Sequence, residues 1–411
     1  MSIILPKKVR SIIAVMNEAG FPAHIVGGCV RDLVMQKAPH DWDITTSASP
    51  IQVKELFGKS WDTGLKHGTV TVNFEGQFFE ITTWRKDMAY NDHRHPDRVE
   101  FTNSLEVDLF RRDFTMNAIA YHPDEGLIDP FHGMDDIKNR LIRSVGDPIK
   151  RFGEDALRML RAIRFSAQLG FEIEARTYAA IGDLHKDINY VSFERIQGEL
   201  NKILESENPC KLRLIWDTGL NTAVFPDICP LPELCIKACM NISPAPENRV
   251  LILSALFYGA IGGNRYNSAS SALLRLKYDN DTVLGVINTL KATEITTAPT
   301  ERNRRRACKL YGSGAVLNAG YLLLLERSKT GEVLRYPKIA LEESIENSLS
   351  GSDLIAAGLN PGKEIGMILS TLELCLFEKP ELNDRETLMM LAKAIHSKIR
   401  YITVNSPVLS L

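Results

Sequence analysis

Near its N-terminus the chain reads Ile25-Val26-Gly27-Gly28-Cys29-Val30-Arg31-Asp32, and shortly afterwards His40-Asp41-Trp42-Asp43-Ile44. A glycine pair after a β-like run lets backbone N–H groups approach an anion, and it opens a helix whose N-terminal end attracts phosphate. Gly28 and Arg31 are therefore the candidate phosphate contacts of the first stretch, because a guanidinium adds a charged donor to the same oxygens.

The second stretch supplies two carboxylates. Asp41 and Asp43 alternate with apolar neighbours, so a strand would direct both side chains to one face. Carboxylates in this arrangement can hold a divalent cation, here Mg²⁺, that is shared with a triphosphate. Taken alone, Gly-Gly is most often a plain turn and Asp-x-Asp a solvated strand edge. The two patterns together, at this spacing, are much more specific.

The composition bounds the class of protein. The 411 residues carry 49 Lys and Arg against 51 Asp and Glu, for a formal net charge of −2. A content of 44% hydrophobic and 24% charged residues is typical of a globular protein and excludes disorder or coiled coil as a global description. Any nucleic-acid surface must therefore be a local concentration of Lys and Arg. The seven cysteines are odd in number and scattered, which favours reduced thiols in a cytoplasmic protein, and no membrane span is expected.

The periodicity of the apolar residues changes near residue 150. Before it, β-like runs at 23–26, 42–44, 69–74, 77–84 and 99–101 alternate with helical patterns; after residue 152, helical periodicity takes over, including one helix expected over 154–169. We therefore predict an α+β head with a mixed β-sheet over residues 1–147, an all-α neck over 148–220, and a helical body and tail over 221–411.

The conjunction of Gly-Gly, Arg-Asp and Asp-x-Asp resembles the signature of the nucleotidyltransferase superfamily. In its extended form the sequence is similar to the class II tRNA nucleotidyltransferases, which add CCA to tRNA 3′ ends, together with the bacterial poly(A) polymerases. The resemblance reaches about residue 200. It implies that Glu80, in Phe79-Glu80-Ile81, is a third catalytic carboxylate, with an exposed strand residue as the alternative. It also implies that Arg112, in Arg111-Arg112-Asp113, contacts the nucleotide, and that residues 86–98 form the family's flexible loop.

A further stretch runs from Phe152 to Phe165 and reads Phe-Gly-Glu-Asp-Ala-Leu-Arg-Met-Leu-Arg-Ala-Ile-Arg-Phe. On a helix its apolar residues share one face, while Asp155, Arg158, Arg161 and Arg164 wind round the other. A solvated, salt-bridged face is the ordinary interpretation of such a pattern. Three successive arginines repel one another, however, and this favours an external anion such as a triphosphate or an RNA end.

By resemblance, Asp155 and Arg158 contact the nucleobase, and the chemistry of the bases agrees with this role. Cytosine and adenine each present an exocyclic amine donor beside a ring-nitrogen acceptor, whereas uracil and guanine present a carbonyl beside an N–H. A carboxylate next to a guanidinium complements the first pattern and mismatches the second. Arg161 and Arg164 would hold phosphates or the helix itself. Arg195, in a later motif of the family, is expected to brace the fold.

The sequence thus predicts template-independent addition of CCA to tRNA from CTP and ATP, with tRNA held at its 3′ end and elbow. Asp41 and Asp43 would hold Mg²⁺ with help from Glu80. CC-only addition, A-only addition and poly(A) synthesis are the alternatives within the enzyme class; the length of the segment 86–98 favours full CCA addition over CC-only addition. A non-catalytic tRNA-binding protein is the alternative from another class.

Overall fold

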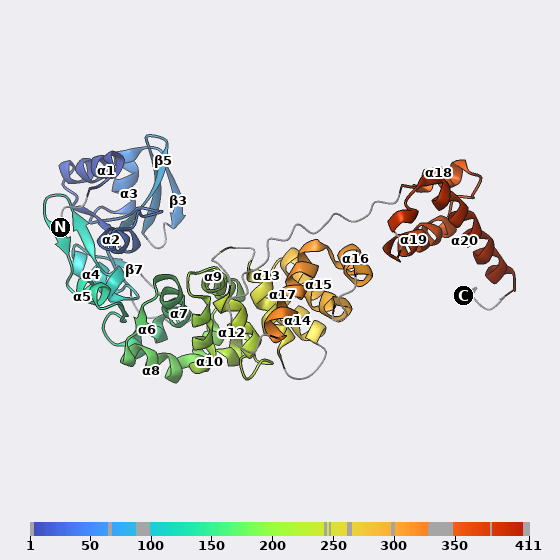
Figure 1. Cartoon of the computed structure of the whole chain (residues 1–411). Helices are drawn as coiled ribbons and strands as arrows, with labels where there is room; N and C mark the ends of the chain where they lie inside the picture. The colour runs from blue at the N-terminus through green and yellow to red at the C-terminus, as the bar shows by residue number, and fades with distance from the viewer. Residues whose placement is uncertain are drawn as a thin grey trace. The chain divides into compact units, whose positions relative to one another are not determined.

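The computed structural model describes residues 4–64, 68–87, 99–241, 245, 248–260, 265–296, 301–327, 348–378 and 380–405. The chain divides into two compact units. The first comprises Met1–Arg249 with Ala260–Gly263 and Ser271–Tyr278, and the second comprises Val250–Gly259, Asn264–Ser270 and Asp279–Leu411. The predicted head and neck both belong to the first unit (Figure 1).

A mixed seven-stranded sheet forms the centre of the head, in the order β3-β4-β5-β2-β1-β8-β9. Every neighbouring pair is antiparallel except β2 and β5, which run parallel. The strands are β1 Ala23–Val26, β2 Asp43–Thr46, β3 Ser60–Gly64, β4 Thr69–Phe74, β5 Gln77–Thr83, β8 Ala120–His122 and β9 Gly126–Ile128. The turn signal Glu75-Gly76 joins β4 to β5, with φ values of 48° and 80° that suit a two-residue hairpin. The predicted mixed sheet is confirmed.

One face of the sheet is covered and forms a core. Helix α1 (Lys7–Glu18) packs on β1, and α3 (Pro50–Phe57) packs on β4 and β5. Alternation along β4 and β5 buries Val70, Val72, Phe79 and Ile81 on this side. The residues between them, among them Glu80, therefore lie on the opposite face, here called the open face, which is the face that carries the candidate catalytic groups.

The head contains further short helices and strands outside the central sheet. They are α2 Gly28–Val34, α4 Leu105–Phe110, η2 Thr115–Asn117, α5 Gly133–Lys138, β10 Leu141–Ile142 and the β-ribbon of β6 Arg85–Asp87 with β7 Val99–Phe101. A small core of Val26, Leu109, Ala118, Ala120 and Val145 joins β1, α4 and β8. Of the predicted flexible loop, Lys86 and Asp87 belong to β6, and residues 88–98 lie outside the described residues.

The neck differs from its prediction in two details. It contains a two-residue strand, β11 (Glu172–Ile173), which pairs in parallel with β10 of the head, so it is not purely helical. The helix predicted over 154–169 begins only at Leu157, because Asp155 is extended, with φ −144° and ψ 102°, and Glu154 is the last residue of the preceding helix. The neck helices are α6 Pro148–Glu154, α7 Leu157–Leu169, α8 Ala175–Leu184, η3 His185–Tyr190, α9 Phe193–Leu204, η4 Pro209–Arg213 and α10 Leu214–Asp217. Helices α11 Asn221–Val224 and α12 Glu233–Met240 follow at the start of the predicted body.

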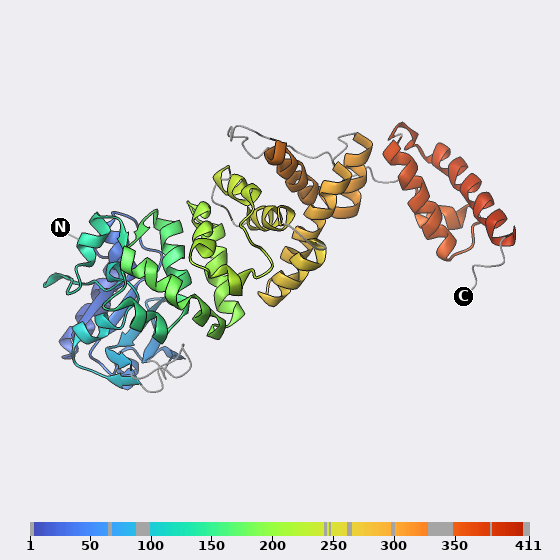
Figure 2. The same ribbon diagram turned by 90° about the horizontal axis from the view of Figure 1, so that it is seen from below.

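The rest of the described chain is helical. Its elements are α13 Asn248–Tyr258, α14 Arg265–Arg275, α15 Asn280–Thr296, α16 Glu301–Tyr311, α17 Ser313–Arg327, α18 Gly351–Ala356, α19 Lys363–Glu378, η5 Pro380–Leu382 and α20 Arg385–Asn405. Helices α19 and α20 lie side by side (Figure 1 and Figure 2), and Leu354, Ile368, Leu372 and Leu388 are buried in the core that they share with α18. Within the described ranges, no helix has the length and apolar character needed to cross a bilayer.

Candidate active site

Three carboxylates gather at the junction of β2 and β5. Asp43 pairs directly with Glu80 across the two parallel strands, so both side chains lie on the open face. Asp41 precedes β2 by two residues rather than lying within it. Desolvation in this recess raises the pKa of Asp43, and the Asp41 carboxylate raises it further, while Arg112 lowers it. Desolvation likewise raises the pKa of Glu80, with contributions from Asp43 and Asp41. The three groups therefore form a cluster of negative charge that Arg112 compensates only in part.

This cluster of carboxylates suits a hard cation whose remaining ligands come from the substrate and water. In the part of the chain that the structure describes, no group of three His, Cys, Asp or Glu side chains is placed to enclose a metal ion. Mg²⁺ rarely uses an all-protein cage: it is usually bound by one or two carboxylates together with substrate phosphates and water. The oxygen donors of Asp41 and Asp43 fit that mode, and the mutual repulsion of the carboxylates favours a cation beside them.

The guanidinium of Arg112 lies against the turn between β1 and α2 and acts on the Asp43 carboxylate. Gly27 has φ 81°, and a Cβ at this position would lie 2.8 Å from Nη1 of Arg112. A Cβ on Gly28 would make only an ordinary contact with Arg31, at 3.7 Å. The sequence prediction singled out Gly28, whereas the geometry requires glycine at Gly27, so that the guanidinium can approach the backbone.

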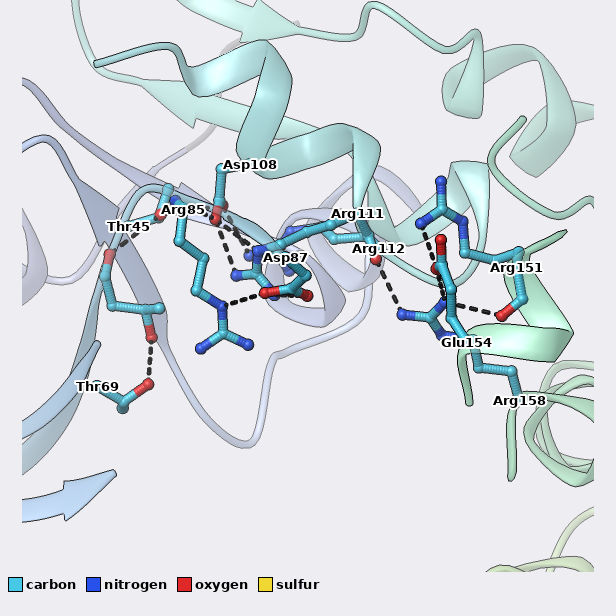
Figure 3. Close-up of polar contacts among 11 residues, drawn as sticks. Thr45, Thr69, Arg85, Asp87, Asp108, Arg111, Arg112, Arg151, Glu154 and Arg158 are labelled. Carbon is cyan, nitrogen blue, oxygen red and sulfur yellow. Dashed lines mark hydrogen bonds and ion pairs between the residues drawn. The ribbon is translucent and has the colours of Figure 1, made fainter. Parts of the chain in front are cut away.

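Arg112 lies beside the buried carboxylate of Asp108, a residue that the sequence prediction did not single out. Asp108 is fully buried and lies 2.8 Å from Arg111 and 3.7 Å from Arg112, and it accepts a hydrogen bond of 3.2 Å from Thr45 on β2 (Figure 3). Nε of Arg112 is buried without a hydrogen-bond partner among the described residues. Asp108 is the fourth residue before Arg112, and this i,i+4 spacing is the feature of the sequence from which their ion pair could have been predicted.

A cavity of about 260 Å³ gathers most of the predicted nucleotide contacts. Its lining consists of Arg111, Arg112, Asp113, Asp155, Leu157, Arg158, Arg161 and Arg195. Gly28, Arg31 and Arg164 do not line it. Arg31 is buried and donates to Asp32 at 2.7 Å and to Asn117 at 2.8 Å, so its described contacts are with the protein itself. The cavity thus brings together residues from the head, from the two neck helices α7 and α9, and from Asp155 between α6 and α7.

The two predicted base contacts are each braced separately. Arg195 donates to both carboxylate oxygens of Asp155, at 3.2 and 2.9 Å, which agrees with the bracing role predicted for Arg195. Arg158 donates to Glu154 at 2.9 Å, to the carbonyl oxygen of Arg151 at 2.9 Å and to that of Arg111 at 3.0 Å (Figure 3). Because these contacts fix both side chains, the pair is organised before any nucleotide arrives.

The arginine stripe of α7 is neutralised within the protein. Arg158 pairs with Glu154 at 2.9 Å, Arg161 with Asp113 at 2.6 Å, and Arg164 with Glu199 at 2.7 Å. Burial alone would raise the pKa of Asp113, but Arg161 and Asn117 hold that pKa well below its usual range. These arginines therefore have acidic partners within the protein, although Arg158 shares Glu154 with Arg151, so repulsion among them does not by itself require an external anion. Asp113 and Glu199 lie far from α7 in sequence, and only the fold brings them to it.

Two family models match the first unit. Residues 23–143 match the poly A polymerase head domain, and residues 170–231 match a probable RNA and SrmB-binding site of polymerase A. The first match covers the sheet, both aspartates, Glu80 and Arg112. The class that the fold and site define is thus that of the nucleotidyltransferases with a head of the poly(A) polymerase type.

Matches to whole proteins narrow this class. The chain is 37% identical to the CCA-adding enzyme of Lactobacillus helveticus (strain DPC 4571), over 89% of this chain and 91% of the relative. It is also 37% identical to the CCA-adding enzyme of Limosilactobacillus fermentum, over 93% of this chain and 95% of the relative. The CCA-adding enzyme of Bacillus stearothermophilus in complex with CTP has the same fold, with a TM-score of 0.73 and 30% identity over 97% of this chain and 100% of that one. The chain belongs to the family of CCA-adding enzymes.

Proposed function

We propose that this protein adds CCA to the 3′ end of tRNA from CTP and ATP, without a nucleic-acid template and with release of pyrophosphate. The observation that carries the proposal is the pairing of Asp43 with Glu80 on the open sheet face, beside a cavity lined by Asp155 and Arg158. Family membership supports it, since relatives that align over nearly their whole length are CCA-adding enzymes.

Asp41 and Asp43 are the residues that would hold Mg²⁺, and Glu80 adds negative charge next to them. Mg²⁺ held by these residues would supply Lewis-acid activation of the RNA 3′-hydroxyl and would stabilise the leaving pyrophosphate. Arg112 lies between the carboxylates and the cavity, where its positive charge meets the phosphates of a nucleotide whose base enters the cavity. No covalent intermediate is required, because positioning and charge stabilisation account for in-line transfer.

Base selection follows from the hydrogen-bonding capacity that remains at the two selecting residues. A carboxylate has about four lone-pair sites, and Asp155 uses three of them, for the Leu157 N–H and for two donors of Arg195. A guanidinium has about five N–H donors, and Arg158 uses three in its described contacts. One acceptor and two donors remain. They match an exocyclic amine beside a ring nitrogen, as in cytosine and adenine, and they mismatch uracil and guanine.

The test of the reaction is direct. Purified protein is incubated with Mg²⁺, with each NTP separately and in combination, and with tRNA that ends before, within or after CC. Extension by CCA, and arrest after CCA is complete, is the expected result. Arrest after CC indicates a CC-only enzyme, addition of A alone to tRNA ending in CC indicates an A-only enzyme, and long A tails indicate a poly(A) polymerase. Absence of any extension would support a binding protein.

The metal is tested without turnover. Mg²⁺ with a non-hydrolysable CTP analogue should raise the melting temperature of the wild-type protein, because a ligand that binds only the folded state stabilises it. An Asp41→Ala/Asp43→Ala variant should lose the Mg²⁺-dependent part of this increase. An unchanged dependence on Mg²⁺ in the variant would assign the metal to other residues.

A further inference from the structure

A row of four side chains crosses the sheet from the catalytic carboxylates to its edge. Asp43 on β2 pairs with Glu80 on β5, Glu80 pairs with Thr71 on β4, and Thr71 pairs with Trp61 on β3. Residues that pair directly on neighbouring strands point to the same face of a sheet. Trp61 therefore lies on the open face, in line with the carboxylates and three strands away from Asp43.

Phe78 joins Trp61 on this face. It precedes Glu80 by two residues on β5, and the alternation of a strand puts both side chains on one side. The rings of Trp61 and Phe78 lean toward each other over β4, with centroids 5.4 Å apart and planes at 61°. Trp61 is 48% exposed and Phe78 62% exposed, whereas Phe79, on the covered face, is only 2% exposed. The pair therefore adds little to the core of the head.

Contiguous exposed apolar side chains, such as these two rings in contact, are a feature of binding surfaces. The ligand that must reach this face is the RNA whose 3′-hydroxyl is extended beside Asp41 and Asp43. Three strand spacings of about 4.8 Å put Trp61 roughly 14 Å from Asp43. A stacked strand rises about 3.4 Å per nucleotide, so this distance corresponds to about four nucleotides at most.

We propose that Trp61 and Phe78 form a stacking platform for the unpaired nucleotides that precede the 3′-hydroxyl of the RNA substrate. The proposal rests on the proposed function. Unpaired bases are commonly bound by stacking on aromatic side chains, and this mode tolerates any base because every base has a π face. That tolerance suits a strand whose terminal bases change as nucleotides are added. The platform serves the RNA and not the incoming nucleotide, since no residue of β3, β4 or β5 lines the cavity that contains Asp155 and Arg158.

Steady-state kinetics with the full-length protein test this role. Trp61→Ala and Phe78→Ala should each raise the KM for tRNA by about five- to 150-fold, the range expected for loss of one base stack. The KM for CTP and kcat at saturating tRNA should stay within about twofold of wild type. Trp61→Phe, which keeps an aromatic ring, should retain most of the affinity, whereas Trp61→Leu, which keeps only apolar bulk, should not.

Ile51→Ala is the matched control, because Ile51 is 67% exposed and lies on α3, which covers the other face of the same sheet. It should leave both KM values unchanged. An unchanged KM for tRNA in Trp61→Ala and Phe78→Ala, or equal increases for tRNA and CTP, would overturn the platform.

A binding measurement separates the platform from the reaction. 2-Aminopurine placed in the unpaired 3′ segment of tRNA should lose fluorescence on binding to the wild-type protein, because stacking quenches it, and less so with the Trp61→Ala/Phe78→Ala variant. If the wild-type protein extends no tRNA but still quenches the probe through these residues, the proposed reaction fails and the platform stands. Equal quenching by both proteins excludes the platform whatever the activity.

Discussion

Arg195 of α9 donates one hydrogen bond to each carboxylate oxygen of Asp155, at 3.2 and 2.9 Å. Asp155 is the extended residue between α6 and α7, and its carboxylate also accepts a hydrogen bond of 3.1 Å from the Leu157 N–H at the start of α7. The bidentate contact therefore sets the direction of the carboxylate that is proposed to select the base. It also explains why a residue 40 positions away matters to the cavity.

Selection of the base should depend on this contact. Asp155→Ala should lower the preference for CTP over UTP by at least about a hundredfold, because the acceptor that matches the exocyclic amine is lost. Arg195→Ala should lower the preference by a smaller factor, since the carboxylate remains but is less constrained. Relative kcat/KM values for CTP and UTP, measured in competition, provide the test. Equal losses for all four NTPs would return Asp155 to a purely structural role.

The carboxylates of Asp43 and Glu80 should lower the free energy of unfolding while they support activity. Asp43→Asn should reduce kcat by at least about a hundredfold, yet leave the free energy of unfolding equal to or above that of wild type, because it removes charge repulsion. The raised pKa values of Asp43 and Glu80 mean that the folded protein binds these protons more tightly than the unfolded chain. Their destabilising effect is therefore absent below the ordinary carboxyl pKa of about 4 and develops as the pH rises through the raised values.

The pH dependence of stability and that of activity test this prediction. As the pH is lowered from 7 toward the ordinary carboxyl pKa of about 4, wild type should gain stability relative to Asp43→Asn in urea unfolding, while its activity falls as the carboxylates take up protons. A parallel pH dependence of stability in the two proteins would show that Asp43 is not electrostatically strained.

Gly27 and Gly76 offer a matched pair of glycine substitutions. Both have a left-handed φ, of 81° and 80°, but a Cβ at Gly27 meets Arg112 at 2.8 Å and a Cβ at Gly76 meets nothing within 4 Å. Gly76→Ala should cost only the backbone strain, about 1 kcal/mol of unfolding free energy, with full activity. Gly27→Ala should cost more, because its φ of 81° and ψ of −132° form a combination that is essentially restricted to glycine, and it should raise the KM for nucleotide, because Arg112 must move. Similar activities of the two variants would argue against a role for the approach of Arg112 to the turn.

The pair of Asp113 and Arg161 should be a major contributor to the stability of the first unit. Asp113 is buried, and the Arg161 guanidinium lies 2.6 Å from it and above the ring of Phe165. Asp113→Ala should lower the free energy of unfolding by about 2 to 4 kcal/mol, because it leaves Arg161 without its partner in a largely desolvated site. Asp217→Ala, which breaks the exposed pair with Arg213, should change it by less than about 0.5 kcal/mol. Urea unfolding of both variants tests the difference.

Much of the fold was readable from local patterns. The strands at Ala23–Val26, Thr69–Phe74 and Val99–Phe101 have the predicted bounds, and the turn at Glu75-Gly76 joins β4 to β5 as expected. These segments carry their own signal, because alternation and turn residues act over a few positions. Strand β3 was missed, since Ser60-Trp61-Asp62-Thr63-Gly64 shows little apolar alternation and gains its place by pairing with β4.

By itself, the sequence determined the mixed sheet, the helical remainder, the family, and the residues Asp41, Asp43, Glu80, Arg112, Asp155 and Arg158 as candidates. Only the tertiary structure decided how they are held: Asp108 behind Arg112, Arg195 on Asp155, Glu199 on Arg164, and Trp61 in register with Glu80. The physical reason is the separation along the sequence over which each effect acts. Propensity and periodicity act between near neighbours, whereas the ion pairs and strand registers that set direction and charge join residues tens of positions apart, which meet only when the chain has folded.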